Sequence, residues 1–188
     1  MRLPCLTAAA ALLAATAAGA ASYRIDPTHS FVHAEIDHFG TSTIRLRIGP
    51  IDGDIEFDRD TRRGSVGLRI PTARVSSGVP QLDARLRERD LLGAGDNSEA
   101  FFVAERFSFD DRGALSEVRG EFTLRSVSRP LSLRALRFNC YTSPLFRREV
   151  CGGDFAAELK RSEFGADLGL PLVGDRVRLL ITVEAIRQ

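Results

Sequence analysis

The stretch that decides the fold runs from residue 118 to residue 135 and reads VRGEFTLRSVSRPLSLRA. From Val118 to Leu124, apolar or small residues alternate with polar ones, and the same alternation returns from Leu131 to Ala135. A period of two is typical of β-strands that bury one face and leave the other polar. The stretch therefore predicts two consecutive strands that share a buried face.

The same period recurs on both sides of this stretch. Residues 30–37, 66–70 and 177–184 each alternate apolar with polar side chains. Turn-forming residues such as Asp52-Gly53-Asp54 and Gly174-Asp175 separate these segments. About eight strands at regular spacing follow from this reading, which favours an antiparallel barrel or a sandwich.

One segment breaks the alternation. Residues 78–92 read GVPQLDARLRERDLL, in which Leu82 and Leu86 stand four apart. Val79-Pro80 suits the start of a helix and Gly93 suits its end. We expect one short helix inserted between strands. Because no repeat, linker or change of composition interrupts the chain, residues 22–188 are predicted to form a single domain.

Composition limits the classes of function. The chain has 188 residues, of which 44% are hydrophobic and 27% charged, as expected for one globular domain. Its 26 basic and 25 acidic residues leave a formal net charge of +1. A nucleic-acid-binding domain would need a basic surplus, so no nucleic-acid partner is expected. High apolar content with balanced charge also argues against a disordered chain.

The first 21 residues read MRLPCLTAAAALLAATAAGAA. Arg2 precedes an apolar run, and the small residues around Ala20 suit cleavage, which together is the pattern of a secretory signal peptide. The run is too short and too rich in alanine for a good membrane-spanning helix. We therefore expect residues 1–21 to be a cleaved signal peptide, and the remaining protein to be exported without a membrane span.

Two cysteines follow the predicted cleavage site, Cys140 and Cys151. In an oxidising compartment a lone pair is most simply a disulfide. Two cysteines are too few for a structural zinc site, and their spacing is not that of a redox-active Cys-x-x-Cys motif. The sequence therefore predicts a structural disulfide between them.

Residues that carry chemistry are sparse. The chain has no Gly-rich phosphate loop, no nucleophile elbow and no His-Glu-x-x-His motif. Its three histidines are His29, His33 and His38, and on a regular strand the third would face away from the other two. We expect neither a catalytic site nor a bound metal or cofactor.

Four segments stand in a characteristic order: HSFVHAEIDHFG at residues 29–40, DARLRERDLL at 83–92, GEFTLRSVSRPLSL at 120–133 and RSEFG at 161–165. Together they resemble the pattern of the YceI-like family of exported bacterial proteins, over residues 23–186. The resemblance implies a mainly β fold, a single extended, lipocalin-like antiparallel barrel of eight strands with one short helical insertion. It also implies residence in the periplasm, a homodimer in some members, and no catalytic residues.

The resemblance further implies a long apolar lumen that binds a polyisoprenoid-like amphiphile, such as an isoprenoid quinone or its precursor, a prenyl phosphate or a fatty chain. Matching the family register, the side chains expected to line this lumen are Val32, Ala34, Ile36, His38, Leu68, Ile70, Phe102, Phe122, Leu124, Leu133, Leu179, Ile181 and Val183. The same alternation would arise if these side chains simply filled the barrel as a core, so the pattern alone leaves an open and a filled lumen as alternatives.

Two functional hypotheses follow from these alternatives. The first is a periplasmic carrier or scavenger of such a lipid, with Arg85, Arg87 or Arg89 binding a phosphate headgroup, since the guanidinium matches phosphate oxygens. A solvated helix face is the simpler interpretation of these three arginines. The second hypothesis is an envelope stress or interaction protein with a filled barrel and no role in transport.

Overall fold

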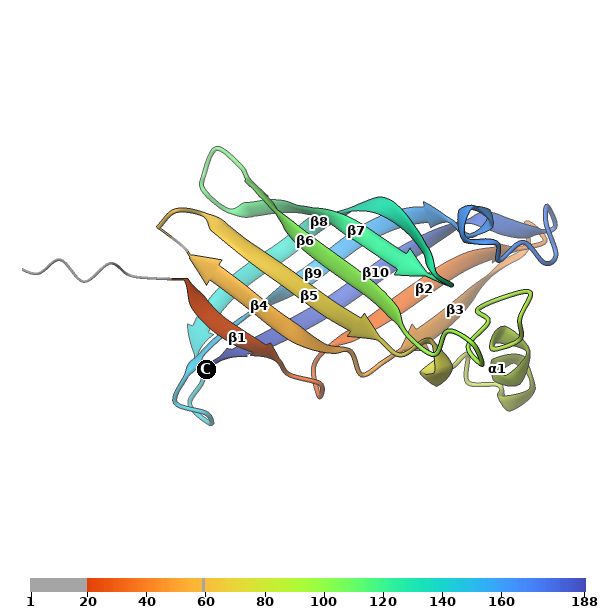
Figure 1. Cartoon of the computed structure of the whole chain (residues 1–188), viewed down its shortest axis with the longest axis horizontal. Helices are drawn as coiled ribbons and strands as arrows, with labels where there is room; N and C mark the ends of the chain where they lie inside the picture. Colours follow the sequence, from red (N-terminus) through yellow and green to blue (C-terminus); the bar gives the residue numbers. More distant parts are fainter. Residues whose placement is uncertain (1–19, 59) are drawn as a thin grey trace, which may run out of the picture.

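The computed structural model describes residues 20–58 and 60–188, and antiparallel strands dominate it (Figure 1). All but the last two residues of the predicted signal peptide lie outside this range. The strands are β1 (Ala21–Ile25), β2 (Phe31–His38), β3 (Ser42–Ile48), β4 (Asp52–Asp58), β5 (Arg63–Ile70), β6 (Ala100–Phe109), β7 (Leu115–Leu124), β8 (Val127–Thr142), β9 (Glu149–Lys160) and β10 (Val173–Arg187). The helical segments are η1 (Thr72–Arg74), α1 (Pro80–Leu86) and η2 (Arg161–Phe164).

The described strands form one sheet in the order β1-β4-β5-β6-β7-β8-β9-β10-β2-β3, and a pairing between β1 and β10 closes it. Along one edge, β10 pairs with β2 at residues 173–182 and with β1 at residues 185–187. β1 and β2 therefore lie one after the other along the same edge of β10. At the next position around the barrel, β4 pairs with β1 and β3 pairs with β2. The ten segments therefore occupy eight strand positions, and the prediction of a closed eight-stranded antiparallel barrel is confirmed.

The break between β1 and β2 is held by the side chain of Ser30 and the backbone amide of Asp26. Ser30 is fully buried, and its hydroxyl donates to the carbonyl of Glu184 and accepts from its amide, at 3.2 and 3.0 Å. The Asp26 amide donates to the same carbonyl at 2.8 Å. These bonds satisfy the β10 backbone where a neighbouring strand is interrupted, as a buried backbone requires.

The break between β3 and β4 lies beside the first. Ile51, also fully buried, donates its amide to the carbonyl of Ser30 at 3.1 Å. Gly49 has a φ of +144°, and a Cβ at this position would stand 2.7 Å from the ring of Phe31. Only glycine fits both the backbone conformation and the space.

Side-chain burial follows the predicted alternation, with two informative shifts. Phe102 and Ala104 face inward on β6, but a bulge between Ala104 and Arg106 moves the inward face to Phe107. An equivalent bulge between Ala135 and Arg137 brings Phe138 inward on β8. A bulge adds one residue to one strand, which exchanges the faces beyond it.

The predicted helix is present but shorter than residues 78–92. After α1, the chain continues as turns, and the β7–β8 turn holds it in place: Arg125 donates to the carbonyls of Arg89 and, at 2.6 Å, Leu91. These carbonyls are thereby satisfied without a continuing helix. The inserted segment covers one end of the barrel (Figure 1).

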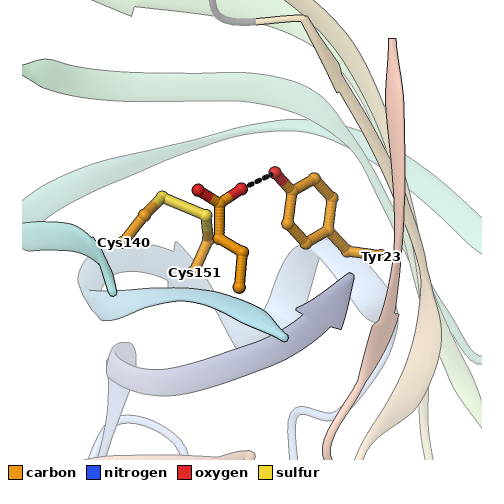
Figure 2. The surroundings of a disulfide bond; sticks show 4 residues. Tyr23, Cys140 and Cys151 are labelled. Carbon is orange, nitrogen blue, oxygen red and sulfur yellow. Dashed lines mark hydrogen bonds between the residues drawn. A yellow bond between two sulfur atoms is a disulfide. The ribbon is translucent and has the colours of Figure 1, made fainter. Parts of the chain in front are cut away.

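A disulfide joins Cys140 to Cys151, as predicted, across directly paired positions of β8 and β9 (Figure 2). Beside it, the hydroxyl of Tyr23 donates to a carboxylate oxygen of Glu149 at 2.5 Å. Because Tyr23 belongs to β1, this bond ties the turn end of the β8–β9 hairpin to the strand that closes the barrel.

Removing the disulfide is expected to destabilise the fold. It closes a loop with a sequence separation of 11 residues, and constraint of the unfolded chain by such a loop contributes about 2–3 kcal/mol. We expect Cys140→Ser/Cys151→Ser to lower the free energy of unfolding in urea by that amount. Dithiothreitol should bring the wild type to the same value and leave the variant unchanged; an unchanged wild type would contradict the assignment.

The turn before β2 is expected to make stability depend on pH. The buried Asp26 carboxylate accepts from Thr28 and lies 2.8 Å from Nδ1 of His29. The bond to Asp26 raises the pKa of His29 above its ordinary 6.5. The contribution of this bond to the free energy of unfolding is therefore full below pH 6.5, and it is lost as the pH rises through the pKa that His29 has in the folded protein. The stability difference between wild type and His29→Ala should therefore shrink from pH 6 to pH 9. Parallel curves would exclude this linkage.

Candidate functional site

An apolar cavity of about 140 Å³, the first cavity, lies inside the barrel at the end that the inserted segment covers. Strands β2, β3, β5, β6, β7, β8, β9 and β10 all contribute to its wall. Leu86, Leu91 and Leu92 of the inserted segment also line it. The segment that interrupts the strands is thus part of the cavity lining.

Most of the residues expected to line a lumen do so. Eleven of the thirteen line the first cavity: Val32, Ala34, Ile36, Leu68, Ile70, Phe102, Phe122, Leu124, Leu133, Leu179 and Ile181. Val183 lines a second cavity instead. His38 lies elsewhere: it is half-buried at the end of β2, where its ring packs edge-on against Phe39, and it lines neither cavity.

The second cavity, of about 70 Å³, lies further along the barrel toward the disulfide. Its wall includes Phe57, Phe107, Phe138 and Phe155, together with Cys151. The bulges in β6 and β8 turn Phe107 and Phe138 inward, which is why strict alternation did not predict them. In this structure the lumen therefore contains two small cavities in succession.

Four side chains line both cavities and lie between them. They are Leu68, Phe102, Leu133 and Ile181, from β5, β6, β8 and β10. Each is at most 7% exposed. They therefore form the boundary that the two cavities share.

For some of the cavity-lining residues that were not predicted, the sequence contains a pattern from which their inward orientation could have been predicted. Leu46 and Ile48 alternate with Arg45 and Arg47 on β3, the ordinary mark of an inward face. Leu91 and Leu92 carried none, because they lie in turns after α1, where no period applies.

One charged side chain, Arg161, also borders the first cavity, although it is only 7% exposed. Its guanidinium donates to the carbonyls of Ala166, Leu168, Val173 and Gly174, at 2.6 to 2.9 Å. Burial lowers its pKa, and the charges of Asp175 and Asp167 oppose that shift. These bonds fasten the loop between η2 and β10 at the rim of the barrel.

The three arginines proposed for a headgroup lie on the inserted segment, outside the cavities. Arg85 makes two 2.6 Å bonds to Asp90, and Arg89 bonds to Asp96 at 3.0 Å. The Arg85 bond lowers the pKa of Asp90. The structure thus pairs two of the predicted headgroup ligands with carboxylates, and their role with a ligand stays a prediction.

The three histidines do not converge. His29 bonds to Asp26, His33 is exposed, and His38 contacts Phe39. Within residues 20–58 and 60–188, no group of three or more histidine, cysteine or carboxylate side chains is arranged to hold a metal ion. In the same residues, no helix has the length and apolar character needed to cross a membrane.

Comparison with known proteins gives a consistent match. The sequence profile of the YceI-like domain matches residues 23–185. A UPF0312 protein of Pseudomonas aeruginosa (strain LESB58) is 31% identical over 189 residues, covering 99% of this chain and 97% of its own. Protein YceI of Escherichia coli O157:H7 is 28% identical over 186 residues, covering 97% and 96%.

Two solved structures share the fold. BcnA of Burkholderia cenocepacia superposes with a TM-score of 0.71 at 17% identity, covering 85% of this chain and 98% of its own. A polyisoprenoid-binding domain from Saccharophagus degradans, implicated in plant cell wall breakdown, gives 0.63 at 14% identity, covering 89% and 99%. At these identities the likeness concerns the architecture.

Replacing Arg161 is expected to weaken the rim of the barrel. Arg161→Met would leave buried carbonyls without donors, and we expect the free energy of unfolding to fall by about 3 kcal/mol or more. Arg161→Lys should recover only part, because an ammonium cannot reproduce the fork of the guanidinium. Arg178→Met, which removes an exposed pair with Glu35, is the control and should cost about 1 kcal/mol or less. Equal losses in urea melts would contradict this role.

Proposed function

The chain belongs to the YceI-like domain family, and from that premise we propose that its barrel binds the hydrocarbon chain of a polyisoprenoid-like amphiphile. The observation that carries the proposal is the first cavity, which is lined almost entirely by apolar side chains contributed by most of the barrel strands. The protein would act in the periplasm as a carrier or scavenger of that lipid. No catalytic step is proposed.

The physical reason is the cost of hydrating a long hydrocarbon. Each Å² of apolar surface removed from water contributes about 25 cal/mol, so an isoprenoid chain strongly favours an apolar interior. The polar groups that border the first cavity are already engaged: Arg161 bonds to backbone carbonyls, and Thr72 donates to the carbonyl of Asn97 at 2.8 Å. Such a lining suits a hydrocarbon and offers little to a polar ligand.

The fold supports the same proposal. A solved neighbour of this architecture is a polyisoprenoid-binding domain. The two cavities succeed one another inside the barrel, which suits an elongated ligand more than a compact one. A chain that occupied both would have to displace Phe102 and its three neighbours at the boundary.

One observation favours the alternative of an envelope interaction protein with a filled barrel. The first cavity measures about 140 Å³, whereas sites for small molecules typically measure about 300–1,000 Å³. In this conformation the lumen holds a short apolar group without rearrangement. The two functions therefore differ in whether the side chains between the cavities yield to a ligand.

The deciding experiment starts from the full chain, expressed in a Gram-negative host and purified from the periplasm. Its intact mass would identify the processed N-terminus, expected after Ala21. Organic extracts and native mass spectra would then be searched for a bound lipid. One isoprenoid or fatty species per chain supports the carrier function; a lipid-free protein that takes up no offered polyprenol or quinone supports the filled barrel.

Substitutions at two positions should change lipid binding in opposite directions. Ala34 faces the first cavity, and the series Ala34→Val, Ala34→Leu and Ala34→Phe should weaken binding progressively, by about tenfold for the largest, because each step occupies ligand space. Phe102→Ala should join the cavities and strengthen binding of longer chains, although it lowers the free energy of unfolding by about 3–5 kcal/mol.

Ile51→Ala is the matched control for both changes. Ile51 is fully buried but lines neither cavity, so its truncation should destabilise the protein without altering lipid affinity. Affinity would be measured by titration with a defined polyprenol. If lipid affinity fell only in proportion to the loss of stability, so that Ile51→Ala bound polyprenol as weakly as Ala34→Phe, the result would argue against binding in the lumen.

A further inference from the structure

The connection between β8 and β9 projects from the end of the barrel opposite α1, beside the C-terminus (Figure 1). At its tip, Leu145 is 81% exposed and Phe146 is 43% exposed. Leu145 has the highest exposure among the large hydrophobic residues that the structure leaves exposed. Two adjacent apolar side chains at a projecting tip form a small surface that water disfavours.

Two arginines follow directly, Arg147 and Arg148. Many other described arginines lie in ion pairs, such as Arg24 with Asp52 and Arg176 with Glu158. In the described part of the chain, no carboxylate lies within ion-pair distance of Arg147 or Arg148. The tip therefore carries two positive charges that no described carboxylate neutralises by an ion pair, and that are free to contact an external anion.

The tip is held in a fixed shape. The amides of Arg147 and Ser143 donate to the carbonyls of Ser143 and Arg148, at 2.8 and 2.9 Å. The disulfide closes the hairpin just below it, and Glu149 accepts the hydroxyl of Tyr23 from β1 (Figure 2). Leu145 and Phe146 are thus presented by a rigid element, which reduces the entropy lost on docking.

We propose that this hairpin tip, defined as residues 143–148, docks the protein on an anionic phospholipid surface. Leu145 and Phe146 enter the region between the headgroups, and Arg147 and Arg148 contact lipid phosphates. Apolar side chains beside arginines are the combination that binds the boundary of a charged bilayer. This docking is independent of whether the lumen holds a lipid, and it would bring a lipid carrier to the membrane that contains its cargo.

The charge pattern favours the hairpin tip, rather than an exposed apolar patch at the other end of the barrel, as the surface that contacts anionic lipid. There, Phe39 and Leu172 are also exposed, but Asp37 and Asp167 lie close by in sequence, and the nearby Arg85 and Arg89 are already paired with carboxylates. The hairpin tip combines two adjacent exposed apolar side chains with two consecutive arginines that make no ion pair with a described residue.

The test is sedimentation of the purified protein with vesicles of phosphatidylcholine containing one third phosphatidylglycerol. We expect binding to these vesicles and little binding to pure phosphatidylcholine. Leu145→Ser/Phe146→Ser and Arg147→Gln/Arg148→Gln should each lower the partition coefficient by about tenfold or more. Raising the salt from about 0.1 M to about 1 M should weaken wild-type binding and affect the arginine variant much less.

Matched controls remove the same groups elsewhere on the barrel. Val103→Ser removes an exposed apolar side chain from β6, and Arg106→Gln/Arg134→Gln removes two exposed charges from the wall. Both should bind vesicles as the wild type does. Ala34→Phe should also bind normally, which separates a failure of docking from a failure of the lumen proposal.

Three results would overturn the proposal. One is wild-type protein that does not sediment with the anionic vesicles. Another is equal loss of binding in the tip and wall variants, which would indicate a general charge effect. The third is a dimer, detected by sedimentation velocity, that the Leu145→Ser/Phe146→Ser variant converts to a monomer while vesicle binding is absent; the tip would then contact a second copy of this chain.

Discussion

Closure of the sheet at β10 is the constraint on which the rest of the structure depends. This strand pairs with β9 along one edge and with both β2 and β1 along the other, so its neighbour is interrupted where two segments meet. Ser30 and Asp26 satisfy the backbone of Glu184 at that interruption. Because the pairing of β1 with β10 closes the sheet, the inward faces of eight strand positions surround one enclosed space.

The shape of that space follows from irregularities in the strands. Bulges in β6 and β8 exchange the inward and outward faces partway along, which brings Phe107 and Phe138 inside and leaves Leu136 on the surface. The interior is consequently divided into an aliphatic part near α1 and an aromatic part near the disulfide. A ligand long enough to occupy both parts would have to accommodate this division.

The two ends of the barrel are stabilised differently. At one end, the side chains of Arg125 and Arg161 donate to backbone carbonyls and fix the inserted segment and the η2–β10 loop. At the other end, a disulfide and the Tyr23–Glu149 bond fix the β8–β9 hairpin. Arginine bonds to backbone carbonyls hold the segments at the end with the larger cavity, while the covalent link supports the projecting tip at the other end.

The sequence by itself determined the strand alternation, the single inserted helix, the cysteine pair and most of the side chains that face the barrel interior. It did so because a period of two and turn residues are local properties of the chain. The tertiary structure decided what is not local: the bulge positions, the inward rotation of Leu91 and Leu92, the burial of Arg161 against loop carbonyls, and the position of His38 outside the cavities. A one-residue bulge, or a carbonyl satisfied by a distant arginine, depends on which strands and loops are neighbours, and neighbours are fixed only when the barrel closes.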